Sequence, residues 1–266
     1  LRDLPGPLLA CLRAFFAAAC LVPFVRPATI RFRGALVPMA ICFAAMNVLF
    51  LSAMTWTTAA AAVFLQYTAA PWAFLLGLWL LKEHWRPGGL LAVGCAVAGI
   101  TWIVVTSPGD QHLLGNLLAV GSGVTFAGVI VSLRRLRGES PVFLVLVNQS
   151  ASCLVLLPWL AWRLGDRLTE FPPEQWLLLA AFGIVQMTIP YLLFARGLQH
   201  VRAQDGALIA LLEPVLTPIW VWLAGWETAA GSTWIGGGLI LMGLVLRYTV
   251  FARRETSSPQ GPRAGP

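Results

Sequence analysis

The sequence predicts an all-α membrane protein, a multi-span bundle of hydrophobic helices that cannot be a soluble domain. Two observations lead to this fold class. Of the 266 residues, 58% are hydrophobic and only 11% are charged, whereas soluble domains carry about 25% charged residues. Several uninterrupted apolar runs also reach the roughly 20 residues that a helix needs to cross the hydrocarbon core of a bilayer. Too little charge is left to solvate a surface, so most of the chain is expected to lie in lipid.

Nine helices are predicted from the apolar runs, each bounded by glycine, proline or charged residues. The first run is longer than the apolar core of a signal peptide, and its start carries both Arg2 and Asp3. The tail over 252–266 is polar and rich in Pro, Gly and Ser, so we expect it to be a disordered cytoplasmic tail. The helices are expected at about 6–25, 34–54, 57–81, 88–106, 113–135, 141–163, 174–197, 203–225 and 231–251.

Arginine and lysine are unevenly shared between alternate loops, which predicts the orientation because basic residues near span ends stay in the cytoplasm. One set of loops, together with the C-terminal end, holds fourteen basic residues, whereas the opposite set holds Arg2, Arg163 and Arg167. We therefore expect a multi-pass protein of the cell inner (plasma) membrane, with a cytoplasmic C-terminus and with Leu1 outside. The formal net charge of +7 comes from these loop clusters and does not indicate nucleic acid as a partner.

The two halves of the chain match each other when one is shifted by 144 residues. The shift superposes Glu83 on Glu227, and these two residues fall on opposite sides of the membrane in the predicted orientation. That relation is typical of inverted-topology repeats, a recurrent architecture of secondary transporters. We expect a first repeat over 1–106, which lacks its first helix, and a second repeat over 113–251. The other matched pairs are Leu49 with Leu193, Phe50 with Phe194, Ala59 with Ala203, Gly94 with Gly238, and Gly99 with Gly243.

Small residues recur at four-residue spacing along the helix expected at 113–135. They are Gly115, Ala119, Gly123 and Ala127. Because small residues let helix backbones approach closely in lipid, the stripe predicts a packing seam and carries no chemistry.

One carboxylate, Glu213, lies in the middle of a predicted helix, beside Pro214 and close to Pro218. Ionisable groups inside membrane helices are costly and usually face a protein interior or a water-filled cavity. The prolines interrupt the backbone hydrogen bonds there, as in the broken helices around transport sites. Pro71 lies on the corresponding helix of the first half. Glu213 is either a cavity and coupling residue or a structural carboxyl group.

Other polar side chains at mid-span depth complete the expected cavity. Arg13 lies about one turn into the first helix, where it either extends to the membrane surface or provides a counter-charge for an anionic group or for Glu213. Each remaining polar residue alone is more often an interhelical hydrogen bond, but together they can line a cavity. The expected cavity residues are Arg13, Asn47, Gln66, Asn148, Gln186, Tyr191 and Glu213; Tyr67 and Gln149 are polar at similar depth but are not included. Glu83 and Glu227 are expected to cap helix ends or to contact a gate.

Catalytic, metal and cofactor sites are not predicted. The sequence contains no HExxH, GxSxG or DxxD motif, and its five cysteines include no CxxC pair. The cysteines all fall within predicted helices, where we expect buried free thiols. We therefore expect no enzyme and no cofactor.

The chain resembles the EamA-type transporters of the drug/metabolite transporter superfamily over roughly Leu8–Val250. In the first half the resemblance rests on Arg13 and on TTAAAAVFLQYTAAPWAFLLGLWLLKE, which ends at Glu83. In the second half it rests on GNLLAVGSGVTFAGVIVSLRR and on LLEPVLTPIWVWLAGWE, which ends at Glu227. The resemblance implies ten helices in two inverted repeats, so with nine predicted helices we expect the first helix of that pattern to be missing here.

The resemblance implies a secondary transporter that moves small metabolites, such as amino acids, or toxic compounds across the inner membrane. We expect export (efflux), by alternating access around a central cavity. The alternative is a membrane structural or assembly subunit without transport activity. The expected partners are the lipid bilayer and a small-molecule substrate; protons and a second copy of the chain, in a homodimer, stay open as further partners.

Overall fold

The computed structural model describes residues 6–27, 30–57, 59–83, 87–106, 113–164, 172–214, 216 and 231–246. Helices lie within all nine predicted ranges, and the regular structure of these residues is entirely helical, which confirms the all-α fold class. The predictions for Pro218, Glu227 and the tail over 252–266 lie outside the described residues. The helices are α1 (Gly6–Leu21), the short 3₁₀ turn η1 (Val22–Phe24), α2 (Leu36–Trp56), α3 (Ala59–Gln66), α4 (Ala69–Leu80), α5 (Pro87–Thr106), α6 (Leu113–Arg135), α7 (Pro141–Leu164), α8 (Pro173–Phe182), the π-helical turn η4 (Gly183–Thr188), α9 (Ile189–His200), α10 (Ala203–Ala210) and α12 (Gly231–Val245).

Five helical stretches of the described chain are long and apolar enough to cross a membrane. They are Leu36–Trp56, Ala62–Leu80, Leu113–Arg135, Pro141–Pro158 and Pro173–His200. Two shorter apolar helical stretches, Ala10–Phe24 and Gly88–Trp102, complete the set found by length and composition. The molecule is a multi-pass membrane protein.

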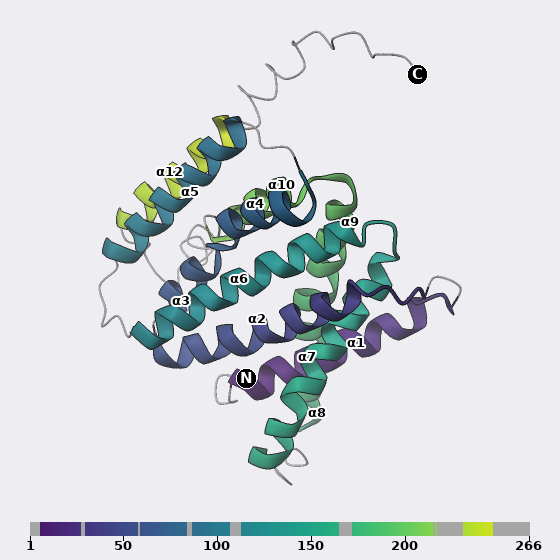
Figure 1. The fold of residues 1–266 in the computed structure, drawn as a ribbon. Helices are drawn as coiled ribbons and strands as arrows, with labels where there is room; N and C mark the ends of the chain where they lie inside the picture. Colours follow the sequence, from purple (N-terminus) through teal and green to yellow (C-terminus); the bar gives the residue numbers. More distant parts are fainter. Residues whose placement is uncertain are drawn as a thin grey trace, which may run out of the picture.

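Helix α6 lies beside α2 and α3 (Figure 1). Its stripe of small residues is buried. Ala119 and Ala127 are fully buried. A side chain at Gly123 would place its first carbon 2.6 Å from the Thr68 hydroxyl, and one at Gly115 would meet the backbone of Trp56 at 2.7 Å. Only glycine permits this approach, so the predicted packing seam is confirmed.

Helices α5 and α12 form a pair beside the rest of the bundle, although they come from distant parts of the sequence (Figure 1). Glycines make their contact close. A first side-chain carbon at Gly99 would lie 2.5 Å from the Gly236 carbonyl oxygen, and one at Gly243 would lie 2.7 Å from Cys95. The two backbones are therefore held together by van der Waals contact, the main attraction available between helices in lipid.

The helix predicted over 57–81 consists of two helices in series, α3 and α4, separated by a turn at Tyr67 and Thr68. Pro71 explains the break, because proline has no N–H to donate to the carbonyl four residues earlier, and its ring clashes with that carbonyl. The Tyr67 carbonyl instead accepts a hydrogen bond from the Ala70 N–H at 3.2 Å. A similar turn occurs at Leu211, three residues before Pro214.

The helix predicted over 174–197 is continuous from α8 to α9 but contains the π-helical turn η4 in its middle. Pro190, which follows the turn, cannot donate to the carbonyl of Gln186, so the regular α-helical pattern is disturbed here. Gly183, the first residue of η4, lies against α1: a first side-chain carbon there would be 2.6 Å from the Arg13 carbonyl oxygen. π-helical turns often occur at functional sites, and η4 contributes to the cavity described below.

Candidate functional site

A cavity of about 500 Å³ lies between α1, α2, α3, α6, η4, α9, α10 and the segment that follows α10. Its volume is within the range of small-molecule sites, roughly 300–1,000 Å³. Six of the seven expected cavity residues line it: Arg13, Asn47, Gln66, Gln186, Tyr191 and Glu213. Residues more than 170 positions apart in the sequence therefore meet around one space.

Among the described residues that line the cavity, one side chain is cationic and one is anionic. Arg13 on α1 donates from Nη1 to the Gln186 Oε1 of η4 at 3.5 Å. On another wall, the Tyr67 hydroxyl donates to the Glu213 carboxylate at 2.5 Å. Each charge is thus held by an uncharged polar group from a different helix, so that a polar ligand would meet both signs of charge within one cavity.

Both breaks in the helices supply cavity groups. Tyr67 occupies the turn between α3 and α4, and Gln66 is the last residue of α3. Glu213 comes two residues after the turn at Leu211. Helix breaks at membrane depth are tolerated where the backbone is buried in protein or borders a water-filled cavity. Both breaks meet this condition, because residues next to each of them line the cavity.

Apolar side chains, several of them aromatic or sulfur-containing, form much of the remaining wall. The Tyr191 ring packs edge-on against Phe43, with centroids 5.3 Å apart, and the Phe126 and Phe194 rings lie 6.2 Å apart. Met46 and Met187 add flexible apolar surface. A ligand of this cavity would therefore have both polar groups and an apolar part.

Asn148 is not among the residues that line the cavity. It lies on α7, a helix that packs against α1, α2 and α9, and it is 2% exposed beside Gln149, which is 1% exposed. Neither Asn148 Oδ1 nor Gln149 Nε2 has a hydrogen-bond partner among the described residues. Asn148 is a polar residue at mid-span depth, but depth does not specify which face of a helix a residue occupies.

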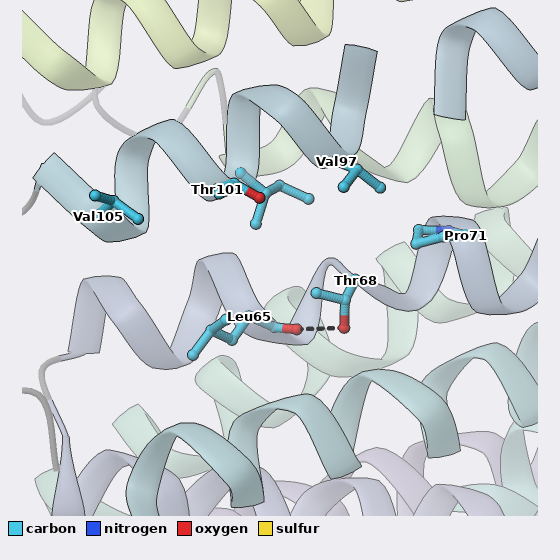
Figure 2. A pocket seen from close by; sticks show the side chains of 7 residues that line it. Leu65, Thr68, Pro71, Val97, Thr101 and Val105 are labelled. Atoms are coloured by element: carbon cyan, nitrogen blue, oxygen red, sulfur yellow. Dashed lines mark hydrogen bonds between the residues drawn. The ribbon is translucent and has the colours of Figure 1, made fainter. Parts of the chain in front are cut away.

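A second, smaller pocket lies between the α3–α4 break and α5 (Figure 2). It has a volume of about 160 Å³ and is lined by Leu65, Thr68, Pro71, Val97, Ile100, Thr101 and Val105. The Thr68 hydroxyl, the polar group nearest the break, donates to the Leu65 carbonyl at 2.7 Å (Figure 2). With few polar groups available, this pocket is a poor fit for a polar ligand.

Four helix ends meet at Glu83, beyond the cavity and toward the arginine-rich loops. Glu83 Oε1 accepts a hydrogen bond from the Ala203 N–H at 3.2 Å and lies 3.9 Å from Arg134 Nε. Arg134 also donates from Nη1 to the carbonyls of Leu198 at 3.2 Å and Gln199 at 2.7 Å. We call these five residues the Glu83–Arg134 junction. A carboxylate at the start of α10 and a guanidinium at the end of α9 both complement helix dipoles.

Lys82 shapes the junction through its backbone. It has a φ of 52°, in the left-handed region, and it is exposed. This conformation turns the chain at the end of α4, so that the Glu83 N–H reaches the Gly77 carbonyl at 3.1 Å. The same turn directs Glu83 back toward α10, because left-handed residues end helices in this way.

A second set of polar contacts lies next to the junction. Gln199 donates from Nε2 to the Glu139 carbonyl at 2.9 Å. The Glu139 carboxylate, whose side chain is 2% exposed, pairs with Arg33 Nε at 2.5 Å. These contacts connect the segment before α2 and the loop between α6 and α7 to the same end of the bundle.

Metal-binding clusters of His, Cys, Asp and Glu are not found within the part of the chain that the structure describes. Cys11 on α1 and Cys153 on α7 approach to 3.9 Å between their sulfur atoms but are free thiols. The cavity itself offers charges, amides and hydroxyl groups from several helices, which suits binding of an organic molecule.

Comparison with known proteins gives consistent matches. Residues 113–249, just over half of the chain, match the model of the EamA-like transporter family. An uncharacterized transporter of Archaeoglobus fulgidus is 25% identical over 252 residues, which cover 93% of this chain and 89% of that protein. The uncharacterized transporter YwfM of Bacillus subtilis is 28% identical over 223 residues, which cover 82% and 74% of the two chains. A protein of known crystal structure can be superposed on this chain over 96% of this chain and 91% of the other chain. The TM-score is 0.79 and the sequence identity is 19%, so the two chains share the fold.

Proposed function

We propose that this chain, which belongs to the EamA-like transporter family, exports a small metabolite that has both charged and apolar parts across the inner membrane. The match to the family model and to two proteins described as transporters confirms the resemblance seen in the sequence and makes the chain a multi-pass transporter. Cargo and direction are the proposed part. Amino acids are one class that fits, and toxic compounds with similar groups are another.

The observation that supports this proposal is the meeting of Arg13, Glu213 and several amides in a single cavity. A carboxylate of the cargo would pair with Arg13, and an ammonium group would pair with Glu213, because opposite charges attract strongly where water is scarce. The aromatic wall at Phe126 and Phe194 would hold an apolar part. Amide side chains would satisfy the remaining donors and acceptors of the cargo.

In this proposal the Glu83–Arg134 junction acts as the inner gate. It joins the ends of α4, α6, α9 and α10 next to the arginine-rich loops, which are predicted to be cytoplasmic. Alternating access requires that such a closure opens when the opposite side closes. The junction is built mainly from helix-end hydrogen bonds, which can re-form with water when the ends separate.

Glu213 is our candidate for proton coupling. Its carboxylate and the Tyr67 hydroxyl form a hydrogen-bonded pair within the cavity. Ionisable residues at this depth frequently relay protons in transporters. Binding of a proton at Glu213 would remove the charge that holds a cationic group of the cargo, so that proton entry and cargo release would be linked.

The two inverted repeats, over 1–106 and 113–251, are part of the same proposal. In inverted-repeat transporters the substrate site lies near the membrane midplane at the interface of the repeats, often beside discontinuous helices. The breaks at Tyr67 and Leu211 come from the two predicted repeats and both border the cavity. Two interrupted helices, one from each predicted repeat, beside a shared cavity are expected if the chain consists of two inverted repeats.

The test is reconstitution of the full chain in liposomes with a panel of radiolabelled amino acids and cationic drugs. We expect saturable uptake of at least one compound into vesicles loaded with the same unlabelled compound. Gln186→Ala, in the cavity, should lower the uptake about fivefold if its contact with Arg13 positions the cargo, since a long hydrogen bond of 3.5 Å contributes about 1 kcal/mol.

The matched control is Gln175→Ala, on α8 of the same continuous helix and outside the cavity lining. Uptake by this variant should equal that of the wild type. If the wild-type protein shows no saturable uptake of any compound, the structural or assembly subunit becomes the better explanation. If both glutamine variants are equally impaired, the cavity is not the transport site.

A further inference from the structure

A third pocket lies outside the central cavity, where α2 begins and α6 ends. It has a volume of about 430 Å³ and is lined by Arg33, Gly34, Ala35, Pro38, Arg135 and Leu136. The two arginines come from different parts of the chain. Since α2 starts at Leu36 and α6 stops at Arg135, both guanidinium groups lie at the same end of the bundle.

Arg33 is held in place from within the protein. Its Nε pairs with the buried Glu139 carboxylate at 2.5 Å, while 55% of the Arg33 side chain stays exposed. Glu139 is itself fixed, because its N–H donates to the Leu136 carbonyl at 2.9 Å. The guanidinium is thus positioned in advance, which lowers the entropy lost when it binds a ligand.

Arg135 provides the second cation and is exposed. Arginine remains charged under all physiological conditions, and its planar donors match phosphate geometry. Two guanidinium groups on one pocket therefore favour a phosphate-bearing ligand over a neutral one.

An exposed apolar strip begins at the same pocket and continues along α2. Val37 is 61% exposed and Ile41, one turn further, is 62% exposed, whereas Leu36 and Met39 on the same helix are buried. Phe32, just before the pocket, is 87% exposed. A cationic pocket at a helix end that continues into an exposed apolar strip matches the two parts of a phospholipid.

We propose that this pocket binds an anionic phospholipid, with Arg33 and Arg135 contacting the headgroup phosphate and Val37 and Ile41 contacting an acyl chain. Anionic lipids give the cytoplasmic leaflet its negative surface potential, and basic pockets between membrane helices on that side bind their headgroups. The site is separate from the central cavity, since the two share no lining residue. Its test does not depend on transport.

The experiment counts lipids retained by the full chain in native mass spectrometry, after transfer from mixed micelles with dioctanoyl phosphatidylglycerol or dioctanoyl phosphatidylcholine. The key variant is Arg135→Gln, because changing Arg33 would leave the buried Glu139 without its partner. Arg137→Gln is the matched control: Arg137 is also exposed and lies two residues away, but outside the pocket.

The wild type and Arg137→Gln should retain phosphatidylglycerol with equal apparent affinity, and Arg135→Gln should weaken it about fivefold, the effect of one interfacial basic residue. Retention of phosphatidylcholine should be weak and similar in all three. Equal phosphatidylglycerol retention by Arg135→Gln and Arg137→Gln would overturn the proposal, because general surface charge would then explain binding.

Two further arms complete the test. Ile41→Ser, which leaves every charge in place, should lower phosphatidylglycerol retention if an acyl chain lies on the strip; unchanged retention overturns that assignment. Inorganic phosphate at millimolar concentration should not displace the lipid. Displacement by inorganic phosphate would show a free-phosphate site and overturn the assignment to a phospholipid.

Discussion

The hydroxyl of Tyr67 and the carboxylate of Glu213 form a 2.5 Å hydrogen bond between two interrupted helices. Tyr67 occupies the turn before Pro71, and Glu213 follows the turn at Leu211 and precedes Pro214. The bond joins residues that lie 146 positions apart in the sequence, each next to a break in its helix. It brings the Glu213 carboxylate to a position fixed from both halves of the chain.

Replacement of Glu213 by glutamine tests its role in coupling. Glutamine has nearly the same size and can still accept the Tyr67 hydrogen bond, so we expect the fold to be retained. Transport should lose its dependence on an imposed pH gradient, because the variant side chain cannot bind a proton. Flux into proteoliposomes with and without the gradient measures this. Unchanged rate and unchanged gradient dependence would make Glu213 a structural carboxyl group.

Tyr67→Phe removes only the hydroxyl that donates to Glu213. A hydrogen bond to a charged group contributes about 1.5–3 kcal/mol, so we expect a roughly tenfold loss of transport if the bond holds Glu213 in its working position. Thr55→Val is the control, because the Thr55 hydroxyl donates to the Ser52 carbonyl at 2.7 Å and Thr55 does not line the cavity. Initial rates of uptake compare the two. Equal effects of both substitutions would contradict a special role for the Tyr67 bond.

The stability of the Glu83–Arg134 junction should depend more on the hydrogen bonds that Arg134 donates to α9 than on its ion pair with Glu83. At 3.9 Å the pair is too long for a direct hydrogen bond, so we expect it to contribute at most about 1 kcal/mol. Arg134 also donates to two backbone carbonyls at 3.2 and 2.7 Å, and charged hydrogen bonds contribute about 1.5–3 kcal/mol. Arg134→Gln should therefore lower the free energy of unfolding by about 2–3 kcal/mol, and Glu83→Gln by less than about 1 kcal/mol.

Denaturant titration of the purified protein in detergent, followed by circular dichroism, measures the two unfolding energies. Arg137→Gln, at an exposed position nearby, provides a baseline for removal of one surface arginine. The expected order of destabilisation is Arg134→Gln, then Glu83→Gln, then Arg137→Gln. A larger loss from Glu83→Gln than from Arg134→Gln would show that the ion pair dominates.

Gly183 and Gly197 lie on the same continuous helix and should respond oppositely to alanine. At Gly183 the added carbon would lie 2.6 Å from the Arg13 carbonyl oxygen, whereas at Gly197 it meets nothing within 4 Å. Gly183→Ala should push α1 away from η4 and lower stability by about 1–3 kcal/mol, the usual cost of overpacking. Gly197→Ala should be neutral or stabilising, since alanine favours helix. Thermal unfolding of the two variants in the same detergent decides the question.

The sequence allowed the helices to be placed because their apolar length is a direct consequence of membrane thickness. It also indicated Arg13 and Glu213, since an ionisable group inside a span is costly and rare. The structure brings both to one cavity; that they bind cargo stays a prediction. Phe126 and Phe194 could not be selected in advance, because apolar residues occur on every face of a membrane helix.

Local irregularities were harder to predict. Pro71 was expected to interrupt its helix, but its presence did not specify a turn between two helices, and the π-helical turn before Pro190 was not predicted. Which form occurs depends on neighbours, such as α1 packed against Gly183. Similarly, Arg134 is one of the fourteen basic residues that predict the orientation, whereas its bonds to the end of α9 depend on the tertiary fold.

Lys82, exposed and left-handed beside Glu83, is the only lysine in the sequence. Within this sequence, the Lys82 side chain thus offers an acylating reagent one lysine amine to modify, next to the proposed gate. A fluorophore attached there would report opening of the junction through changes in its emission. With a reagent that cannot cross lipid, labelling in sealed vesicles of known sidedness would also show which compartment this helix end faces.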